Sequence, residues 1–403
     1  MRVAIVHDWL VTWGGSERVL EQMLALYPQA DLFTVVDFLP AAQRAPLAGR
    51  KITTSFIQRL PKARTHYNSY LPLMPVAIEQ FDLSGYDLVL SSSHCVAKGV
   101  ITGPNQVHVS YIHSPMRYAW DMQHEYLHEA GLETGVRSWL VRWMLHKLRV
   151  WDARSASGVD ACVANSSFIA RRIAKAYRRQ APVIHPPVDV EQIAPGGARE
   201  DFYLTASRLV PYKRVDLIVE AFATMPNRRL VVIGDGPELE SLRKKATPNV
   251  QLLGYQSTPV LHDHLRRAKA FVFAALEDFG IILAEAQAAG TPVVAFGQGG
   301  ARDIIRGLDS PNPTGVFIDE QTPESLKAGL RRFEREAGRI DPADCRRNAE
   351  RFGAERFREE FAGLIAEVMQ SFEQRCAAVE PRLPLAANVL QERGDDLPQG
   401  AAA

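Results

Sequence analysis

The sequence has few of the features that mark specialised classes of protein. Its 403 residues include four cysteines, none in a C-x-x-C pair, so a disulfide scaffold is excluded and free thiols in a reducing compartment are expected. No uncharged apolar run reaches the roughly 18 residues of a membrane-spanning helix. The N-terminus, MRVAIVHDWL, lacks a secretory cleavage site and is typical of a core strand. We expect a cytoplasmic protein, soluble or peripheral on the cytoplasmic face of the membrane.

Charge and nucleotide-binding fingerprints exclude two further classes. The 47 Lys and Arg residues almost balance the 46 Asp and Glu residues, which argues against a general nucleic-acid-binding protein. A G-x-G-x-x-G fingerprint is missing after the first expected strand, and no acid closes the second strand in the expected way. A nicotinamide- or flavin-dependent oxidoreductase is therefore poorly supported.

Short β-branched runs alternate with amphipathic segments along the chain, which is the pattern of parallel sheets covered by helices. The pattern predicts an α/β protein with two Rossmann-like domains that face each other across a cleft. The strands are expected at 2–7, 31–36, 86–93, 107–113, 160–165 and 182–185 in the first half, and at 202–207, 229–234, 250–254, 270–275, 292–296 and 315–319 in the second.

The two expected domains meet at residues 185–200, a segment whose Pro and Gly content is typical of a linker. We predict an N-terminal domain over residues 1–190 and a C-terminal domain over residues 200–365. A helix over 366–376 is expected to pack back on the N-terminal domain, and residues 377–403 are expected to be a disordered tail. Ligands of open α/β sheets bind beyond the carboxyl ends of the strands, so the cleft is the expected site.

Two loops at the expected cleft carry groups that suit an anion. Gly14 and Gly15 follow the first strand and precede a helix with Ser16 as its expected N-cap, which lets backbone amides approach a phosphate. Arg208 and Lys213 follow the first strand of the second half, and two cations there suit a diphosphate. The alternatives are a tight turn without a ligand and a pair of solvated surface charges.

The stretch EDFGIILAE places Glu277 and Glu285 eight positions apart. Glu277 is expected on a loop that faces the cleft. Gly280 is expected to start a helix whose first amides, near Ile281, can hold phosphate. Glu285 has apolar neighbours, and an unpartnered carboxylate there costs several kcal/mol. We predict that its partner lies outside the chain and is a vicinal diol such as a ribose. The alternative is an exposed Glu on an ordinary helix.

EDFGIILAE resembles the E-x7-E motif of retaining glycosyltransferase family 4, whose members have the GT-B fold of two Rossmann-like domains. The resemblance covers about residues 1–375. Within the family, HSPMRYAWD is similar to enzymes that build bacterial surface polysaccharides, among which mannosyltransferases are prominent. Further matches in the family's order are the Gly14–Gly15 loop, YIHSPMRYAWD (111–121), PPVD (186–189), SRLVPYKR (207–214), GDGPE (234–238) and LLGYQS (252–257).

The resemblance implies a reaction and its reagents. The donor would be a nucleotide sugar, with GDP-mannose favoured and a UDP- or ADP-hexose as the alternative. The acceptor would be a lipid-linked oligosaccharide or a growing surface glycan. Arg208 and Lys213 would bind the donor diphosphate and stabilise charge on the leaving nucleotide. The sequence has no D-x-D, the usual metal-diphosphate grip of the other large transferase fold, so neither a metal nor a cofactor is expected.

The same resemblance implies roles for the remaining site residues. Glu285 would bind the ribose hydroxyls, and Glu277 would contact hydroxyls of the donor sugar. His113, at the end of an expected strand, would lie beside the anomeric centre, with a purely structural histidine as the alternative. Gly15 would let the backbone of the first domain reach the phosphates.

HEYLH, residues 124–128, matches the H-E-x-x-H helix of zinc metalloproteases. The match extends to H-E-x-x-H-x-x-G, but Thr134 stands where a third histidine would be expected. A zinc metallohydrolase at His124 and His128 would leave the two-domain pattern and the E-x7-E motif without a purpose. It is the alternative class of function.

Residues 136–151, VRSWLVRWMLHKLRVW, combine basic and aromatic side chains, with Trp139, Leu140 and Trp143 on one helical face. Residues 56–70 have a similar composition. Such segments suit the interface of an anionic bilayer, in keeping with a lipid-linked acceptor. The alternative is a core-facing helix whose cations reach solvent.

Overall fold

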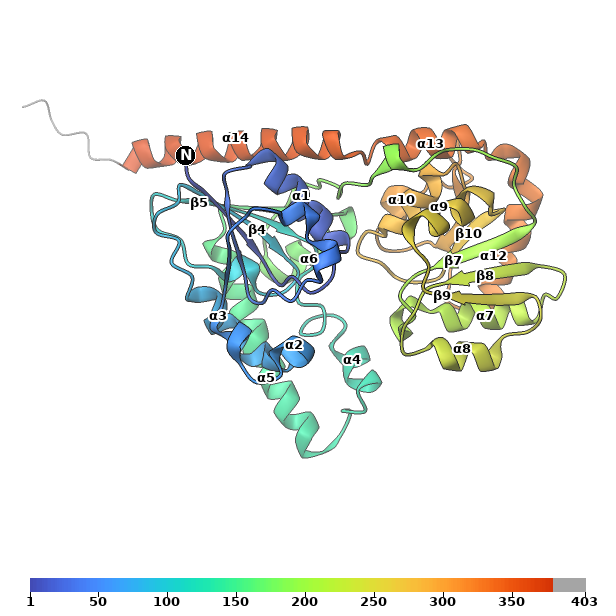
Figure 1. Cartoon of the computed structure of the whole chain (residues 1–403), viewed down its shortest axis with the longest axis horizontal. Helices are drawn as coiled ribbons and strands as arrows, with labels where there is room; N and C mark the ends of the chain where they lie inside the picture. The colour runs from blue at the N-terminus through green and yellow to red at the C-terminus, as the bar shows by residue number, and fades with distance from the viewer. Residues whose placement is uncertain (380–403) are drawn as a thin grey trace, which may run out of the picture.

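The computed structural model describes residues 1–379, which form two α/β domains side by side (Figure 1). The N-terminal sheet has six parallel strands in the order β3-β2-β1-β4-β5-β6. Every residue of β1 and β5 is buried, because helices cover both faces of the sheet. The strands are β1 Val3–His7, β2 Asp31–Thr34, β3 Ile52–Thr54, β4 Leu88–Ser93, β5 Val107–Ile112 and β6 Ala161–Ala164; the helices are α1 Gly15–Leu26, α2 Ala63–His66, α3 Met74–Glu79, α4 Gln123–Glu129, α5 Gly135–Ser155 and α6 Ser167–Tyr177.

The C-terminal domain repeats this architecture. Its six strands are parallel in the order β12-β11-β10-β7-β8-β9, so the predicted pair of Rossmann-like domains is confirmed. The strands are β7 Phe202–Ala206, β8 Arg229–Ile233, β9 Val250–Gly254, β10 Ala270–Phe273, β11 Val293–Phe296 and β12 Gly315–Ile318; the helices are α7 Val215–Ala223, α8 Leu239–Lys245, α9 Thr258–Arg267, α10 Ile281–Ala288, α11 Ala301–Ile304, α12 Pro323–Glu336 and α13 Pro342–Glu350.

The strand order of each sheet fixes where a ligand can bind. The order reverses between β1 and β4 in the first sheet and between β7 and β10 in the second. Loops that leave two such strands turn to opposite faces of the sheet and open a crevice at the carboxyl ends. Those four loops carry, in chain order, the Gly14–Gly15 pair, His94, Lys213 and Glu277.

The chain passes between the domains twice, and the two passages lie together. Val188, in the outgoing linker, donates its N–H to the carbonyl oxygen of Phe352 at 2.9 Å. Val188 also forms an isolated parallel bridge with Gly353, just before the last helix. The two connections therefore form one hinge rather than two independent tethers.

The returning helix, α14 Ala354–Val379, runs along the N-terminal domain (Figure 1). It buries Phe357, Phe361 and Ile365 in the core that contains β1, β4 and β5. The sequence predicts this helix only over 366–376. It begins earlier because the apolar positions recur every fourth residue from Phe357 onward. Residues 377–379, expected in the tail, continue the helix, and the rest of the expected tail, 380–403, lies outside the described residues.

Two strand predictions differ from the structure. Strand β3 was missed because its three residues, Ile52–Thr54, are too short to show an alternating pattern. The strand expected at 182–185 forms only an isolated bridge between Val183 and Ala164. Prolines at 182, 186 and 187 lack the N–H that a longer ladder needs. Separately, no helix within residues 1–379 is long and apolar enough to cross a lipid bilayer.

Candidate active site

Lys213 and Glu277 form an ion pair at the carboxyl ends of β7 and β10. Lys213 ends a short 3-10 turn, and its Nζ donates to Oε1 of Glu277. Only 16% of each side chain is exposed. Burial alone would lower the pKa of Lys213, but the charge of Glu277 outweighs it and raises this pKa. The site therefore contains a charged ammonium held in place by a carboxylate.

Arg208 lies on the same loop but outside this ion pair. Its side chain is exposed. The loop rests on Gly234, where a Cβ atom would overlap the carbonyl oxygen of Ser207, and on Gly236, where a Cβ would overlap that of Leu209. The two glycines have φ of +145° and +156°, so they allow a backbone contact that other residues would block. This contact holds the Arg208 loop at the edge of the cleft.

Glu285 has a partner within the chain, so the prediction that it has none is wrong. It lies on α10 with 7% of its surface exposed, and Nη2 of Arg18 on α1 lies 3.1 Å from its Oε1. Nη1 of the same Arg18 lies 2.7 Å from Oδ2 of Asp189 in the linker. Burial raises the pKa of Glu285, and Arg18 opposes this effect without cancelling it. A partner 267 positions away is not visible in the local sequence.

The first turn of α1, in the N-terminal domain, contacts the first turn of α10, in the C-terminal domain. The N-cap of α1 is Gly14, not the expected Ser16, and Gly14 donates its N–H to Oε2 of Glu17 at 2.9 Å. A Cβ on Gly15 would lie 2.9 Å from Cδ1 of Ile281, so the side chain of Ile281 packs directly on the start of α1. As expected, Gly280 caps α10; its φ is +97°. Both helices therefore direct the positive ends of their dipoles toward one place.

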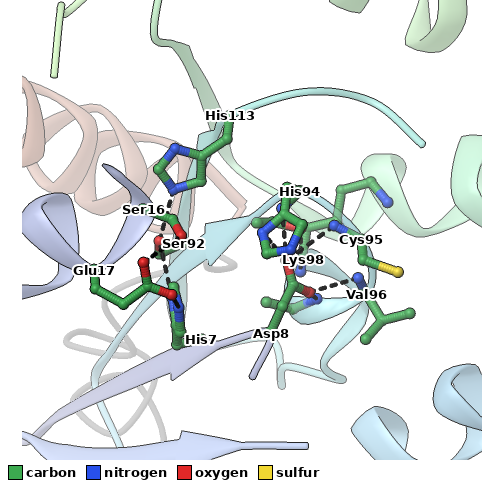
Figure 2. Close-up of polar contacts among 12 residues, drawn as sticks. His7, Asp8, Ser16, Glu17, Ser92, His94, Cys95, Val96, Lys98 and His113 are labelled. Carbon is green, nitrogen blue, oxygen red and sulfur yellow. Dashed lines mark hydrogen bonds and ion pairs between the residues drawn. The ribbon is translucent and has the colours of Figure 1, made fainter. Parts of the chain in front are cut away.

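A row of polar contacts links His113 to α1 (Figure 2). Nε2 of His113 lies 2.8 Å from Oγ of Ser92, which lies 3.1 Å from Nδ1 of His7. Nε2 of His7 lies 3.3 Å from Oε1 of Glu17. Burial lowers the pKa of His113 to about 3, with the charge of His94 adding to the effect, so this ring is neutral. The sequence predicted His113 for the site but not the three residues that orient it.

Asp8 organises a second group, the loop after β4 (Figure 2). Its carboxylate accepts backbone N–H groups of residues 94–97 at 2.6–2.9 Å and lies 2.9 Å from Nδ1 of His94. Burial would raise the pKa of Asp8, but His94 and these amides hold it far below its usual value. Burial would lower the pKa of His94, yet Asp8 raises it. Sequence reasoning missed both residues, although polar residues directly after a strand at the cleft are the signal for such a site.

Comparison with known proteins assigns the family. Residues 13–192 match the model described as Glycosyltransferase Family 4, and residues 191–352 match the model described as Glycosyl transferases group 1. The two matches meet at the linker and together cover residues 13–352, which include every strand of both sheets except β1. The chain belongs to glycosyltransferase family 4.

Curated relatives of this family 4 chain act on lipid or inositol acceptors. A GDP-mannose-dependent alpha-(1-6)-phosphatidylinositol monomannoside mannosyltransferase from Mycobacterium tuberculosis (strain CDC 1551 / Oshkosh) is 32% identical over 218 residues, 46% of this chain and 56% of that protein. A D-inositol 3-phosphate glycosyltransferase from Geodermatophilus obscurus is 29% identical over 268 residues, 58% of each protein. The chain thus spans little more than half the length of these curated relatives.

Solved structures share the fold at low sequence identity. A sucrose-phosphate synthase from Thermosynechococcus elongatus superposes with a TM-score of 0.71 at 16% identity, covering 92% of this chain and 100% of that chain. Anabaena HepE, solved in complex with UDP, has a TM-score of 0.66 at 17% identity, covering 91% of this chain and 100% of the other. The likeness establishes the fold, and the expected GT-B architecture of a family 4 chain is confirmed.

In this family 4 chain the HEYLH motif lies on α4, at the surface. His124 and His128 are both exposed, and Nδ1 of His128 lies 2.9 Å from Oε1 of Glu133. Across residues 1–379, no three His, Cys, Asp or Glu side chains are grouped so that they could hold a metal ion. The described part of the chain therefore gives the zinc metallohydrolase alternative no set of ligands.

Proposed function

We propose that the protein is a retaining, metal-independent hexosyltransferase that moves mannose from GDP-mannose to a lipid-linked oligosaccharide or growing glycan. The observation that carries the proposal is the Lys213–Glu277 pair just before α10, together with the contact between the first turns of α10 and α1. One fixed cation and the first turns of two helices suit a nucleotide diphosphate. Arg208 adds a second cation from the same loop as Lys213.

In the proposed reaction, the bond between the donor's anomeric carbon and its diphosphate oxygen breaks. A bond from that carbon to an acceptor hydroxyl oxygen forms on the same face of the sugar, and the hydroxyl passes its proton to the departing diphosphate oxygen on that face. Negative charge grows on the departing diphosphate. Lys213 and the helix amides lower the energy of this charge most in the transition state, which is where binding accelerates a reaction.

The remaining residues are assigned to donor recognition. Arg18 takes only Oε1 of Glu285, so Oε2 is left to accept hydroxyls of the donor ribose. Glu277, held by Lys213, would accept hydroxyls of the donor sugar. His113 is neutral, so its ring can lie beside the anomeric carbon without repelling the positive charge that develops there. Gly14 and Gly15 have no side chains, so the backbone at the start of α1 would be able to approach the phosphates.

The choice of donor rests on the relatives. The mycobacterial relative is described as GDP-mannose-dependent, which supports GDP-mannose, whereas the UDP complex of Anabaena HepE supports a UDP-hexose as the alternative. A thermal-shift panel of GDP-, UDP- and ADP-sugars, followed by transfer assays, tests this, because a ligand at 100 times its Kd stabilises by about 2.7 kcal/mol. The largest shift is expected with GDP-mannose. A larger shift with another nucleotide sugar would identify that compound as the donor instead of GDP-mannose. No shift with any of them would refute the proposed function.

We predict that transfer persists in EDTA, because Lys213, Arg208 and the helix amides take the place of a metal at the diphosphate. The measurement is the initial rate with and without chelator, after extensive dialysis. A metal-dependent transferase of another fold serves as the positive control for chelation. Loss of activity in EDTA that Mg²⁺ or Mn²⁺ restores would show that the reaction needs a metal.

The acceptor side offers a surface for membrane contact on α5. Trp139, Leu140 and Trp143 are 67%, 56% and 51% exposed, so the alternative of a core-facing stripe is wrong for these residues. The core-facing side of α5 instead carries Leu145 and Leu148. Figure 1 shows α5 projecting from the end of the N-terminal domain. Exposed aromatic side chains flanked by cations suit the headgroup region of an anionic bilayer, which is where a lipid-linked acceptor would lie.

We predict that the Trp139→Ser, Trp143→Ser double variant loses most of its binding to vesicles that contain anionic lipid. The two indoles supply most of the apolar area that can enter the headgroup region. Vesicle co-sedimentation at low and high salt measures the effect. Tyr255→Ser is the matched control, since Tyr255 is 77% exposed on the other domain and should not affect binding. Equal binding by the double variant and the wild type would show that α5 does not dock on the membrane.

A further inference from the structure

The loop between β10 and α10 is anchored in several directions at once. Within this loop, Glu277 pairs with Lys213 of the C-terminal domain. Phe279, two residues later, is buried, stacks on His185 of the linker with ring centroids 5.4 Å apart, and meets Phe352 edge-on at 5.5 Å. Both passages of the hinge therefore hold this loop.

Asp278, which follows Glu277 in the loop, is held by the N-terminal domain. Its Oδ1 accepts Nη1 of Arg172 on α6 at 2.8 Å, and its Oδ2 lies 3.4 Å from Nη1 of Arg117. Oγ of Ser166, the N-cap of α6, donates to the carbonyl oxygen of Asp278 at 2.5 Å. The side chain and the backbone of one residue are thus both fixed from across the cleft.

The arginines that hold Asp278 are themselves fixed. Arg172 is 9% exposed, and its Nε also donates to Asp121 at 2.8 Å. The guanidinium of Arg117 lies 5.1 Å from the ring centroid of Tyr212, the residue next to Lys213. Asp278 therefore binds two arginines. Arg172 is anchored within the N-terminal domain, and Arg117 also contacts the Lys213 loop. Removing its charge would leave two partly buried cations without their shared partner.

Two glycines, Gly299 and Gly300, pack against the opposite side of the loop. Gly300 donates its N–H to the carbonyl oxygen of Glu277 at 2.9 Å. A Cβ atom on Gly300 would overlap the backbone of Phe279, and one on Gly299 would overlap the carbonyl oxygen of Glu277. The loop is thus confined between this glycine pair and the side chains of the N-terminal domain. Its position therefore depends on both domains. Glu285 lies more than a turn farther along α10 and contacts the N-terminal domain through a different residue, Arg18.

We propose that Asp278 is a positioning residue, which uses Arg117 and Arg172 to set the place of Glu277 at the donor sugar only when the two domains meet. The inference rests on the proposed role of Glu277 in holding that sugar. Binding of the nucleotide alone involves Glu285 and the first turn of α10, so it does not require Asp278. Through this contact, Glu277 reaches its position at the donor sugar only when the cleft closes.

The test compares Asp278→Asn with Asp303→Asn. Asp303 accepts the backbone N–H and Oγ of Ser167 at 2.6 and 2.5 Å, so it also joins the domains at the start of α6, but it does not lie on the Glu277 loop. Asp278→Asn should lower kcat about 10- to 100-fold, since small misplacement of a reacting geometry has effects of that size. Asp303→Asn should retain kcat within about threefold, because this partly buried contact does not hold the Glu277 loop.

Three further readouts separate positioning from simple loss of structure. The Kd of nucleoside diphosphate for Asp278→Asn should stay within about threefold of the wild type, since that binding energy comes from other residues. Amide hydrogen exchange over residues 276–283 should accelerate in Asp278→Asn and not in Asp303→Asn. Arg172→Gln should reproduce the kcat loss, and the double variant with Asp278→Asn should lose no more than the worse single variant.

Several results would overturn the inference. They are an unchanged kcat in Asp278→Asn, an equal loss in Asp303→Asn, a nucleotide Kd that weakens as much as kcat falls, and unchanged hydrogen exchange over the loop. A wild-type protein that binds nucleotide sugars and transfers the sugar, beside an unaffected Asp278→Asn, refutes only the positioning role. A wild-type protein that binds no nucleotide sugar refutes the proposed function itself.

Discussion

Replacing Lys213 with alanine is expected to lower kcat/KM about 100- to 1,000-fold, because a fixed cation at the departing diphosphate acts mainly on the transition state. The variant also leaves the carboxylate of Glu277, only 16% exposed, without its ion-pair partner. Steady-state kinetics with saturating acceptor measures the loss, and the melting temperature shows whether the fold is retained.

Two further variants isolate the charge. Lys213→Met keeps an unbranched apolar stem but removes the ammonium, which lies 5.3 and 5.8 Å from the ring centroids of Tyr212 and Phe273. It should be as inactive as the alanine variant if the ammonium is what matters. Lys269→Ala is the matched control, because Lys269 pairs at 2.8 Å with Asp201, which is 80% exposed, away from the cleft. An unchanged kcat/KM in Lys213→Ala would remove this residue from the site.

The variants Glu285→Gln and Glu277→Gln are expected to impair different steps, nucleotide binding in the first and sugar transfer in the second. Glu285→Gln should weaken the nucleoside diphosphate and the intact donor alike, by about 10- to 100-fold, because it loses charge-assisted hydrogen bonds to the ribose. Glu277→Gln should leave binding of the free nucleotide nearly intact and lower transfer, because its proposed partner is the sugar. Calorimetric titration with both ligands distinguishes the two variants.

Since Glu285 also pairs with Arg18, its variant needs a control for that ion pair. Asp189→Asn removes the other partner of Arg18 and leaves Glu285 intact, so nucleotide affinity should stay close to that of the wild type. The same phenotype for Glu277→Gln and Glu285→Gln would contradict the division of roles. A stable and active Glu285→Leu variant would show that this carboxylate binds no part of the donor.

The repeating architecture could be predicted from the sequence because its signals are local. All six strands of the C-terminal sheet fall where short apolar runs predicted them, and Gly280 caps α10 as its position before an apolar segment indicates. Burial of Glu285 also followed from its immediate neighbours. Such features depend on residues within one turn or one strand of each other, which is the range over which periodicity is informative.

The contacts that complete the site depend on residues far apart in the chain. Arg18 lies 267 positions from Glu285, and Arg172 lies 106 positions from Asp278, so no local pattern indicates either pairing. The sequence gives no sign of the role of Asp278, because a second acid beside Glu277 on a loop is typical of a solvated surface charge. Its role becomes visible only when the two domains are placed against each other.

The order in which the two cores are completed follows from the path of α14. The core of the C-terminal domain draws on residues between Val188 and Phe352, a contiguous stretch, whereas the N-terminal core also needs Phe357, Phe361 and Ile365. On the ribosome, the domain that is synthesised first is therefore finished last. At ordinary translation rates its apolar face stays uncovered for on the order of ten seconds, while the second domain emerges and folds. A chain that stopped at residue 352 would carry that uncovered face permanently.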